Sequence, residues 1–146
     1  MMDRRECLES LQEHRTEDTM VVSTMGSAAP WSEISGMELD FPSVGSAMGH
    51  AADFAMGLAL AKPDFKVWVL NGDGSMLMNL GTLVTICQTP PPNLVLFVLQ
   101  NNTFEVTGNQ PIPGAGTISF PDLARASGFE FVYEFEKVAA LRGELG

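Results

Sequence analysis

Two short runs of consecutive apolar residues, VWVL at 67–70 and LVLFVL at 94–99, constrain the fold of this chain most strongly. Neither run alternates polar with apolar residues, as a strand with one solvent-exposed face would. Continuous runs are typical of strands in a parallel sheet that helices cover on both faces. The intervening segments have helical character, which also favours a parallel arrangement. We therefore predict an α/β fold, a three-layer α/β/α sandwich around a mainly parallel sheet of about five strands.

Local patterns predict the remaining elements. Helices are expected at 4–14, 49–61, 75–88 and 136–145, and a further helix after Ser119, which we expect to be its N-cap. Strands are expected at 19–24, 66–71, 94–100 and 129–135. The segment 25–50 is rich in Gly, Ser and Pro, which predicts a loop with at most one helical turn. The length of 146 residues corresponds to one domain, 1–146.

Charge and cysteine content exclude several classes of protein. The formal net charge is −10, with 8 basic against 18 acidic residues, which argues against binding to nucleic acid or to an anionic membrane. Cys7 and Cys87 have no metal or redox spacing and are expected to be buried free thiols. The amino terminus has no apolar core, and no apolar stretch reaches the ~20 residues of a membrane span. We therefore expect a cytoplasmic protein.

Polar residues follow both central strands at the point where each ends. Asp73 lies between two glycines after 66–71, and Asn101 and Asn102 follow 94–100. Taken separately, each pattern is explained by a turn, the first with Asp73 as a helix cap. Taken together, neighbouring parallel strands end about 5 Å apart, so that Asp73 and Asn101 can converge. A carboxylate and an amide oxygen at one point predict a Mg²⁺ site.

Gly74 and Ser75 open the helix predicted after Asp73. A helix N-terminus favours a phosphate group, and the glycines leave room for a diphosphate to approach the backbone. Neither the dinucleotide fingerprint G-x-G-x-x-G nor the Gly-Lys-Ser/Thr of a Walker loop occurs. The residues therefore predict a magnesium–diphosphate site of another kind.

The motif Gly72-Asp73-Gly74, followed after 26 residues by Asn101-Asn102, resembles the cofactor motif of thiamine diphosphate-dependent enzymes. The stretch GSAMGHAADFAMGLALAKPDFKVWVLNGDGSMLMNLGTL at 45–83 and TGNQP at 107–111 resemble the sulfopyruvate and phosphonopyruvate decarboxylase group. The resemblance extends over about residues 20–137. It implies the thiamine diphosphate-binding fold, the cofactors thiamine diphosphate and Mg²⁺, and non-oxidative decarboxylation of an anionic 2-oxo acid.

The resemblance also implies metal ligands. Asp73, Asn101 and the carbonyl of Thr103 would bind Mg²⁺, with Asn102 as an alternative ligand. If Asn101 is the ligand, Asn102 occupies the position where the family has glycine. Asparagine tolerates the left-handed backbone expected at that position better than threonine does. The implied contacts with the cofactor are made by Ser46, Met48, Gly72, Asp73, Gly74, Ser75, Asn101, Thr103 and Phe104.

Three of the implied roles concern the reacting part of the cofactor. Met48 would wedge beneath the cofactor and bend it, and the carbonyl of Ser46 would hold its amino group. His50 and Glu105 are the candidate proton-transfer residues. The alternatives for these positions are a core methionine, a structural histidine in a first helical turn and a solvated loop carboxylate.

The resemblance implies that this chain is half of an active site. In the family, the glutamate that activates the cofactor belongs to a pyrimidine-binding domain, and no segment here resembles that domain. We expect it on an alpha-type partner chain, within a homo-oligomer, or elsewhere in a longer fused enzyme. The family's usual last strand is expected either to be absent from this sheet or to lie beyond Gly146. The alternatives are an acetolactate synthase-like carboligase, a 2-oxoacid:ferredoxin oxidoreductase beta subunit, or a non-catalytic thiamine diphosphate-binding or assembly module.

Overall fold

The computed structural model describes residues 2–43 and 48–145. Its centre is a sheet of four parallel strands in the spatial order β2-β1-β3-β4. The strands are β1 (Thr19–Thr24), β2 (Asp40–Ser43), β3 (Lys66–Gly72) and β4 (Leu94–Leu99). A separate antiparallel pair consists of β5 (Thr103–Phe104) and β6 (Gln110–Pro111). The predicted α/β class with a parallel sheet is confirmed, with four strands in place of about five.

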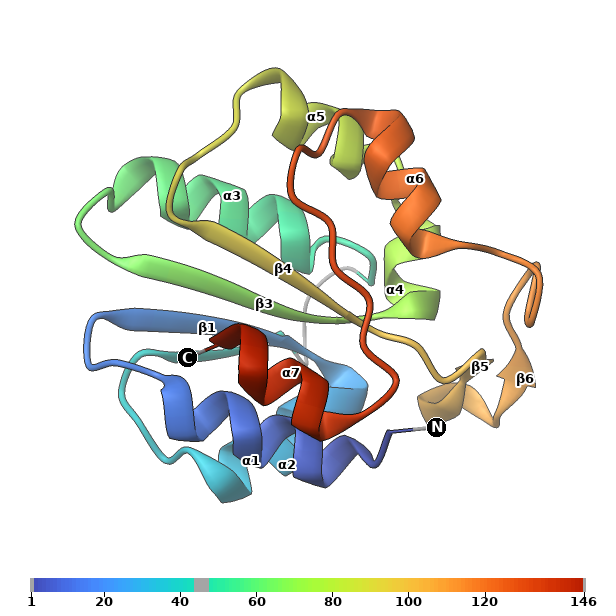
Figure 1. The fold of residues 1–146 in the computed structure, drawn as a ribbon, viewed down its shortest axis with the longest axis horizontal. Helices are drawn as coiled ribbons and strands as arrows, with labels where there is room; N and C mark the ends of the chain where they lie inside the picture. Colours follow the sequence, from blue (N-terminus) through green and yellow to red (C-terminus); the bar gives the residue numbers. More distant parts are fainter. Residues whose placement is uncertain (1, 44–47, 146) are drawn as a thin grey trace.

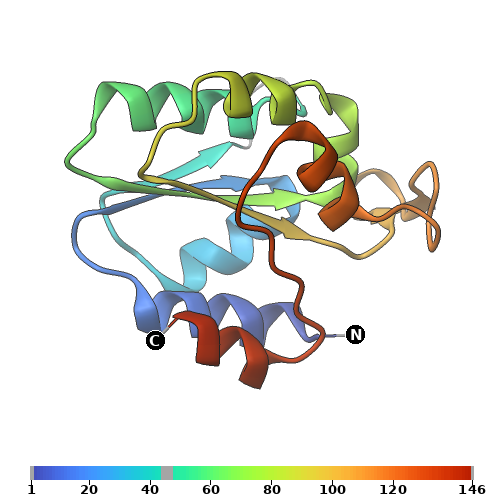
Figure 2. The ribbon, with the colours of Figure 1, turned by 45° about the horizontal axis from the view of Figure 1, so that its top comes forward.

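Helices cover both faces of this sheet, as Figures 1 and 2 show. One face carries α1 (Arg4–His14), α2 (Met25–Ile34) and α7 (Val138–Leu145). The other carries α3 (Ala51–Ala61), α4 (Asp73–Met78), α5 (Thr82–Gln88) and α6 (Phe120–Ser127). Trp68 and Leu70 of β3 pack with α1, whereas Val67 and Val69 pack with α3. Burial of both faces therefore explains the continuous apolar run.

The prediction of a strand at 129–135 is wrong. These residues form no ladder pairs within the described part of the chain. In both ribbon views the segment crosses the outer edge of β4 steeply, because it connects α6 on one face with α7 on the other. Phe131 and Tyr133 are 73% and 56% exposed. The alternation of apolar with acidic residues indicated a half-buried strand, but a crossing segment cannot run alongside β4 and pair with it.

The prediction of a loop over 25–50 is also wrong, since this region contains α2 and β2. Pro30 lies inside α2, where it has no N–H to donate to the carbonyl of Gly26 four residues earlier. Arg4 Nη1 donates a hydrogen bond to that carbonyl at 2.8 Å instead. A distant side chain from α1 thus compensates for the proline, which no local sequence pattern could indicate.

The single helix predicted at 75–88 is two helices, α4 and α5, with a turn at 79–81 between them. Gly81 in this turn is a poor helix former. The helices predicted at 4–14, at 49–61, after Ser119 and at 136–145 are present as α1, α3, α6 and α7. Ser119 is the N-cap of α6, and its Oγ accepts a hydrogen bond from the N–H of Asp122 at 3.2 Å.

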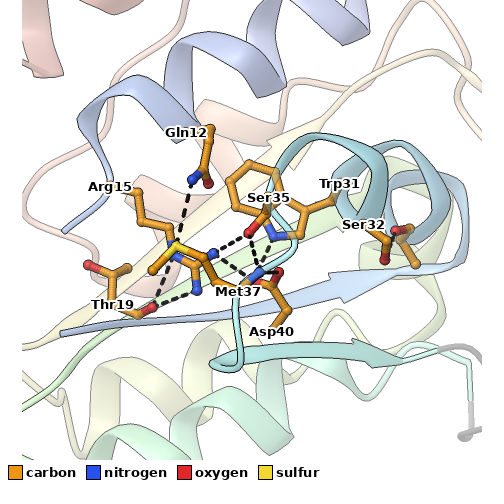
Figure 3. Close-up of polar contacts among 9 residues, drawn as sticks. Gln12, Arg15, Thr19, Trp31, Ser32, Ser35, Met37 and Asp40 are labelled. Carbon is orange, nitrogen blue, oxygen red and sulfur yellow. Dashed lines mark hydrogen bonds and ion pairs between the residues drawn. The ribbon is translucent and has the colours of Figure 1, made fainter. Parts of the chain in front are cut away.

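A buried polar network lies at the amino ends of β1 and β2 (Figure 3). The side chain of Arg15 is 0% exposed, and its Nη1 lies 2.7 Å from Oδ1 of Asp40. Arg15 also donates two hydrogen bonds to the carbonyl of Thr19, and its guanidinium lies 5.6 Å from the ring centroid of Trp31. The indole Nε1 of Trp31 donates to the same Asp40 oxygen at 2.9 Å. One buried ion pair therefore joins the ends of α1, α2, β1 and β2.

Both cysteines are free thiols, but only Cys7 is buried. Cys7 lies on the side of α1 that packs into the core, and this burial raises the pKa of its thiol to about 11. Cys87 is half-buried, contrary to the expectation, and partial desolvation raises the pKa of its thiol as well. Among the described residues, no helix has the length and apolar character needed to cross a membrane.

Candidate cofactor and metal site

The polar residues that follow β3 and β4 meet at the carboxyl edge of the sheet. The Asp73 side chain is buried there, and the residue is 2% exposed. Its Oδ2 accepts hydrogen bonds from the backbone N–H groups of Asn101 at 3.0 Å and Asn102 at 2.6 Å, and its Oδ1 accepts from the N–H of Gly74 at 2.8 Å. A helix cap needs only bonds to its own helix. Asp73 in addition joins the ends of two strands by charge-assisted hydrogen bonds.

The segment after β4 has the backbone expected for the register that uses Asn101 as a ligand. Asn102 is left-handed, with φ 63. Oδ1 of Asn101 accepts a hydrogen bond from the N–H of Thr103 at 2.9 Å, whereas Oδ1 of Asn102 accepts from Nε2 of Gln100 at 3.0 Å. Thr103 lies opposite Pro111, which has no N–H to donate to it. This arrangement favours Asn101 over Asn102 as a candidate metal ligand.

The oxygen atoms around Asp73 fit Mg²⁺ by their chemistry. A carboxylate offers about four lone-pair sites, and Asp73 uses three of them in the hydrogen bonds to Gly74, Asn101 and Asn102. The remaining site is on Oδ1. The amide oxygen of Asn101 and the carbonyl of Thr103 are neutral oxygen ligands of the kind that Mg²⁺ accepts. The described residues contain no cluster of three His, Cys, Asp or Glu side chains suited to a metal, so this oxygen set is the candidate.

Gly74 gives room to an aromatic ring. A Cβ atom at position 74 would lie 2.6 Å from Cδ1 and Cε1 of Phe104, a distance that real Cβ atoms do not show. The ring of Phe104 therefore packs directly on the first turn of α4. The ring occupies the side of Gly74 on which a side chain would project.

Gly74→Ala is expected to displace Phe104 and to lower the free energy of unfolding by about 1–3 kcal/mol, the usual cost of overpacking. Urea titration of the purified chain measures this change. Gly81→Ala is the matched control, because a Cβ atom at position 81 meets nothing within 4 Å. The double variant Gly74→Ala/Phe104→Ala should lose less stability than the sum of its single variants. Equal stability of Gly74→Ala and the unsubstituted chain would contradict the contact.

Glu105 is ion-paired beside this site. Its Oε2 lies 2.6 Å from Nη2 of Arg4, and Nδ2 of Asn101 donates to the same oxygen at 3.3 Å. The hydrogen bond from Arg4 lowers the pKa of Glu105, with partial burial acting in the opposite direction and Asn101 adding a smaller lowering effect. Since a carboxylate can only accept, the contact directs the Asn101 amide nitrogen toward Glu105 and leaves the amide oxygen for other partners.

Arg4→Met is expected to raise the pKa of Glu105 toward the ordinary glutamate value, because the main cause of its lowering is removed. A depressed carboxyl pKa contributes stability that is present above the unfolded-state value of about 4.3 and is lost as the pH falls through the folded-state pKa. Carbon NMR titration of the glutamate carboxyl groups measures the shift. Arg5→Met removes the same charge from α1 but from an arginine that pairs with Glu9 and Glu33, so it should leave Glu105 unchanged.

The segment before α3 lies beside α4. A Cβ atom at Gly49, which has φ 88, would lie 2.9 Å from Cβ of Met78 and 3.4 Å from the carbonyl of Ser75. Met48 precedes Gly49 and is 54% exposed. The imidazole of His50, the N-cap residue of α3, is 55% exposed at the rim. Figure 1 shows the start of α3 close to α4, at the carboxyl ends of the strands.

A groove of about 1510 Å³ runs from the carboxyl edge of the sheet around the outer edge of β4. The segment that crosses β4 supplies part of the lining, from Phe131 to Lys137. Predicted site residues that line it are Met48, Gly72, Asp73, Gly74, Ser75, Asn101, Asn102, Thr103, Phe104 and Glu105. His50 is not among its lining residues, and Ser46 lies outside the described residues.

Three contacts of the site were not predicted from the sequence. Oγ1 of Thr24 accepts from the N–H of Gly72 at 3.2 Å and donates to the carbonyl of Leu70, which ties the end of β1 to that of β3. Arg4 reaches the site from α1. Asp53 contacts His50 at i, i+3. Of these contacts, only that of His50 with Asp53 was predictable, because residues three apart on a helix are neighbours.

This chain belongs to the thiamine pyrophosphate enzymes, since residues 23–145 match the C-terminal thiamine pyrophosphate-binding domain of that family. Over 142 residues it is 35% identical to the beta subunit of sulfopyruvate decarboxylase from Methanocaldococcus jannaschii, covering 92% of this chain and 73% of that one. It is 39% identical over 127 residues to phosphonopyruvate decarboxylase from Streptomyces viridochromogenes, covering 86% of this chain and 31% of that one.

Solved structures show the same fold. Benzoylformate decarboxylase from Polynucleobacter necessarius superposes with a TM-score of 0.85 at 17% identity, over 98% of this chain and 30% of that one. A putative thiamin diphosphate-dependent enzyme from Mycobacterium smegmatis superposes with a TM-score of 0.81 at 21% identity, over 99% of this chain. This chain thus spans less than a third of the length of these solved enzymes.

Proposed function

We propose that this chain is the cofactor-binding subunit of a thiamine diphosphate- and Mg²⁺-dependent enzyme that decarboxylates an anionic 2-oxo acid of the sulfopyruvate or phosphonopyruvate type. The observation that carries the proposal is the buried Asp73 carboxylate, which accepts hydrogen bonds from the N–H groups of Asn101 and Asn102 and so joins the ends of β3 and β4. Relatives named as sulfopyruvate and phosphonopyruvate decarboxylases support the choice of reaction.

In this proposal Oδ1 of Asp73, Oδ1 of Asn101 and the carbonyl of Thr103 hold Mg²⁺. Glu105 fixes the orientation of the Asn101 amide through the contact at 3.3 Å. Ser75, in the first turn of α4, contributes to diphosphate binding, because the first N–H groups of a helix have no partners within the helix. When bound, thiamine diphosphate supplies the electron sink for loss of CO₂. Met48 supports the cofactor, and His50 transfers a proton at the rim of the groove.

A partner chain completes the site in this proposal. The outer side of α3 is apolar, with Phe54 and Leu60 about half exposed and Gly57 between them. An apolar stripe with a glycine at its centre suits close packing against another chain. Relatives named as subunit beta also support an alpha-type partner. The partner would bring the pyrimidine-binding domain.

The charge of the groove supports a second role for the partner. Two basic residues of the described chain line the groove, Arg4 and Lys137, and Arg4 is paired with Glu105. Five acidic residues line the same groove, namely Asp3, Asp73, Glu105, Glu134 and Glu136. An anionic substrate end such as a sulfonate or phosphonate needs positive charge. We infer that the partner supplies most of it.

Two measurements test the proposed function. Calorimetry of the purified chain with thiamine diphosphate should show binding that requires Mg²⁺ and is abolished by EDTA. Release of CO₂ from sulfopyruvate and phosphonopyruvate should require a co-expressed alpha-type chain. Cofactor binding without turnover in the presence of that chain would favour a non-catalytic module. The absence of cofactor binding both with and without that chain would overturn the proposal.

A second candidate function rests on one relative. The chain is 31% identical over 134 residues to the 2-oxoglutarate synthase subunit KorB of Archaeoglobus fulgidus, covering 82% of this chain and 49% of that one. An oxidoreductase of that kind would reduce an added viologen dye in the presence of coenzyme A. The sequence contains only two cysteines, too few to hold an iron–sulfur cluster alone. Reduction of the dye would indicate the oxidoreductase, whereas release of CO₂ without dye reduction would indicate the non-oxidative decarboxylase.

A further inference from the structure

His50 and Asp53 form a close pair at the start of α3. Nδ1 of His50 lies 2.7 Å from Oδ2 of Asp53. An ionised carboxylate can only accept a hydrogen bond, so two atoms at this distance require a proton on Nδ1. The hydrogen bond made by one ring nitrogen of a histidine fixes the tautomer and therefore the role of the other nitrogen. In this arrangement Nε2 is the ring atom left to exchange a proton.

The turn between α4 and α5 holds Asp53 in place. Asn79 is the C-cap residue of α4, and its Nδ2 donates to Oδ2 of Asp53 at 2.6 Å. Oγ1 of Thr82, the first residue of α5, donates to Oδ1 of the same carboxylate. Thr82 is buried, with 2% exposure. Both carboxylate oxygens of Asp53 are thus occupied, and the break in the helix predicted at 75–88 is what brings both donors to face α3.

We propose that Asp53 is a positioning residue, which holds His50 in the tautomer with its proton on Nδ1 and presents Nε2 as the proton-transferring atom of the site. The inference rests on the proposed function for its chemical meaning. Decarboxylation of a 2-oxo acid replaces a carboxylate by hydrogen, so CO₂ leaves and one proton is taken up from solvent. His50 Nε2 takes that proton from water and delivers it to the carbon that has lost CO₂, while Nδ1 stays bonded to Asp53.

The position of His50 fits this task. Its neighbours Met48, Gly49 and Ala51 line the groove, and Gly49 packs against α4. The half-exposed imidazole of His50 is therefore open to solvent and lies next in sequence to residues that line the groove. Among the contacts that the structure gives His50, Asp53 is the charged partner and Asn79 is neutral.

The tautomer is measured directly by long-range ¹H–¹⁵N NMR of the imidazole nitrogens in the purified chain. The sequence contains two histidines, so the spectrum holds only two rings. At a pH where both rings are neutral, His50 should show the proton on Nδ1. Asp53→Asn should shift it to the Nε2–H form that neutral histidine favours in water. His14 is the internal reference, because its Nδ1 bonds the carbonyl of Ser10 at 2.8 Å and should not respond.

The catalytic consequence is measured with the enzyme assembled with its alpha-type chain. His50→Gln should lower kcat by about 100-fold or more, in the range of general acid–base catalysis, and Asp53→Asn by about tenfold or more through loss of the tautomer. Both should keep the affinity for thiamine diphosphate with Mg²⁺. Asp64→Asn, the same change at an exposed residue beyond the end of α3, is the matched control and should match the unsubstituted enzyme.

The results separate this inference from the proposed function. An unchanged His50 tautomer in Asp53→Asn overturns the positioning role, whether or not the cofactor binds. A kcat of Asp53→Asn equal to that of Asp64→Asn in the active enzyme overturns it as well. Failure of the unsubstituted chain to bind thiamine diphosphate overturns the proposed function and leaves the tautomer measurement valid. Thr82→Val, which removes one of the two donors to Asp53, is expected to reduce the Nδ1–H population less than Asp53→Asn does.

Discussion

Asp73→Ala should weaken the binding of thiamine diphosphate with Mg²⁺ by at least about 100-fold. The carboxylate is buried at the junction of β3 and β4 and is the charged member of the candidate oxygen set. Removing one partner of a buried charge pair costs on the order of 3–5 kcal/mol, which corresponds to roughly 10²- to 4 × 10³-fold weaker binding. Isothermal titration calorimetry at fixed Mg²⁺ concentration measures the affinity. Unchanged affinity would refute the assignment of the site.

The same substitution also removes the acceptor of three backbone N–H groups, and each buried donor left without a partner costs about 1–3 kcal/mol. Asp73→Asn separates the two effects, because its amide oxygen still accepts hydrogen bonds while the charge is lost. It should fold more stably than Asp73→Ala and still bind the cofactor far more weakly than the unsubstituted chain. Asp64→Ala, at an exposed position, is the control for loss of a carboxylate as such.

Asp40→Asn should destabilise the fold by about 3–5 kcal/mol, because it leaves the charge of Arg15 buried without its counter-charge. The side chain of Arg15 is fully buried, where it pairs with Asp40 and lies 5.6 Å from the ring centroid of Trp31. Urea unfolding monitored by the fluorescence of Trp31 and Trp68 measures the loss. A change below about 1 kcal/mol would indicate an exposed, weakly coupled pair.

The double variant Arg15→Leu/Asp40→Leu distinguishes an uncompensated charge from a general loss of packing. Replacing both members of a buried ion pair by apolar residues is often nearly neutral, so the double variant should be more stable than either single variant. Asp122→Asn is a matched control, since Asp122 pairs with Arg125 on the surface of α6 with both side chains more than half exposed. Its expected effect is below about 1 kcal/mol.

The central part of the fold was predictable because its signals are local. Continuous apolar runs predicted β3 and β4 and the covering of both faces. The segment 129–135 was mispredicted because its alternating pattern says nothing about the direction in which it crosses β4. The helix α2 was missed because Pro30 is tolerated through a hydrogen bond to Gly26 from Arg4, which is 22 residues earlier. Interactions that depend on distant residues leave no periodic pattern in the sequence.

The site was predictable to a similar degree. The spacing of Asp73 and Asn101 indicated that they converge, and the structure places the backbone N–H of Asn101 within 3.0 Å of Asp73. The left-handed backbone at Asn102 also followed from residue type. The ion pair of Arg4 with Glu105 could not be predicted, because 101 residues separate its members. The packing of Phe104 on Gly74 could not be predicted either, because it depends on how the loop after β4 folds back over α4.

The buried ion pair of Arg15 and Asp40 lies at the amino ends of the strands, whereas the candidate site lies at their carboxyl ends. A stabilising ion pair and the candidate site therefore lie at opposite ends of the same strands. We therefore expect the fold to tolerate substitutions among the exposed residues at the carboxyl ends better than substitutions of Arg15 or Asp40, so that the candidate site can change while the sheet is kept.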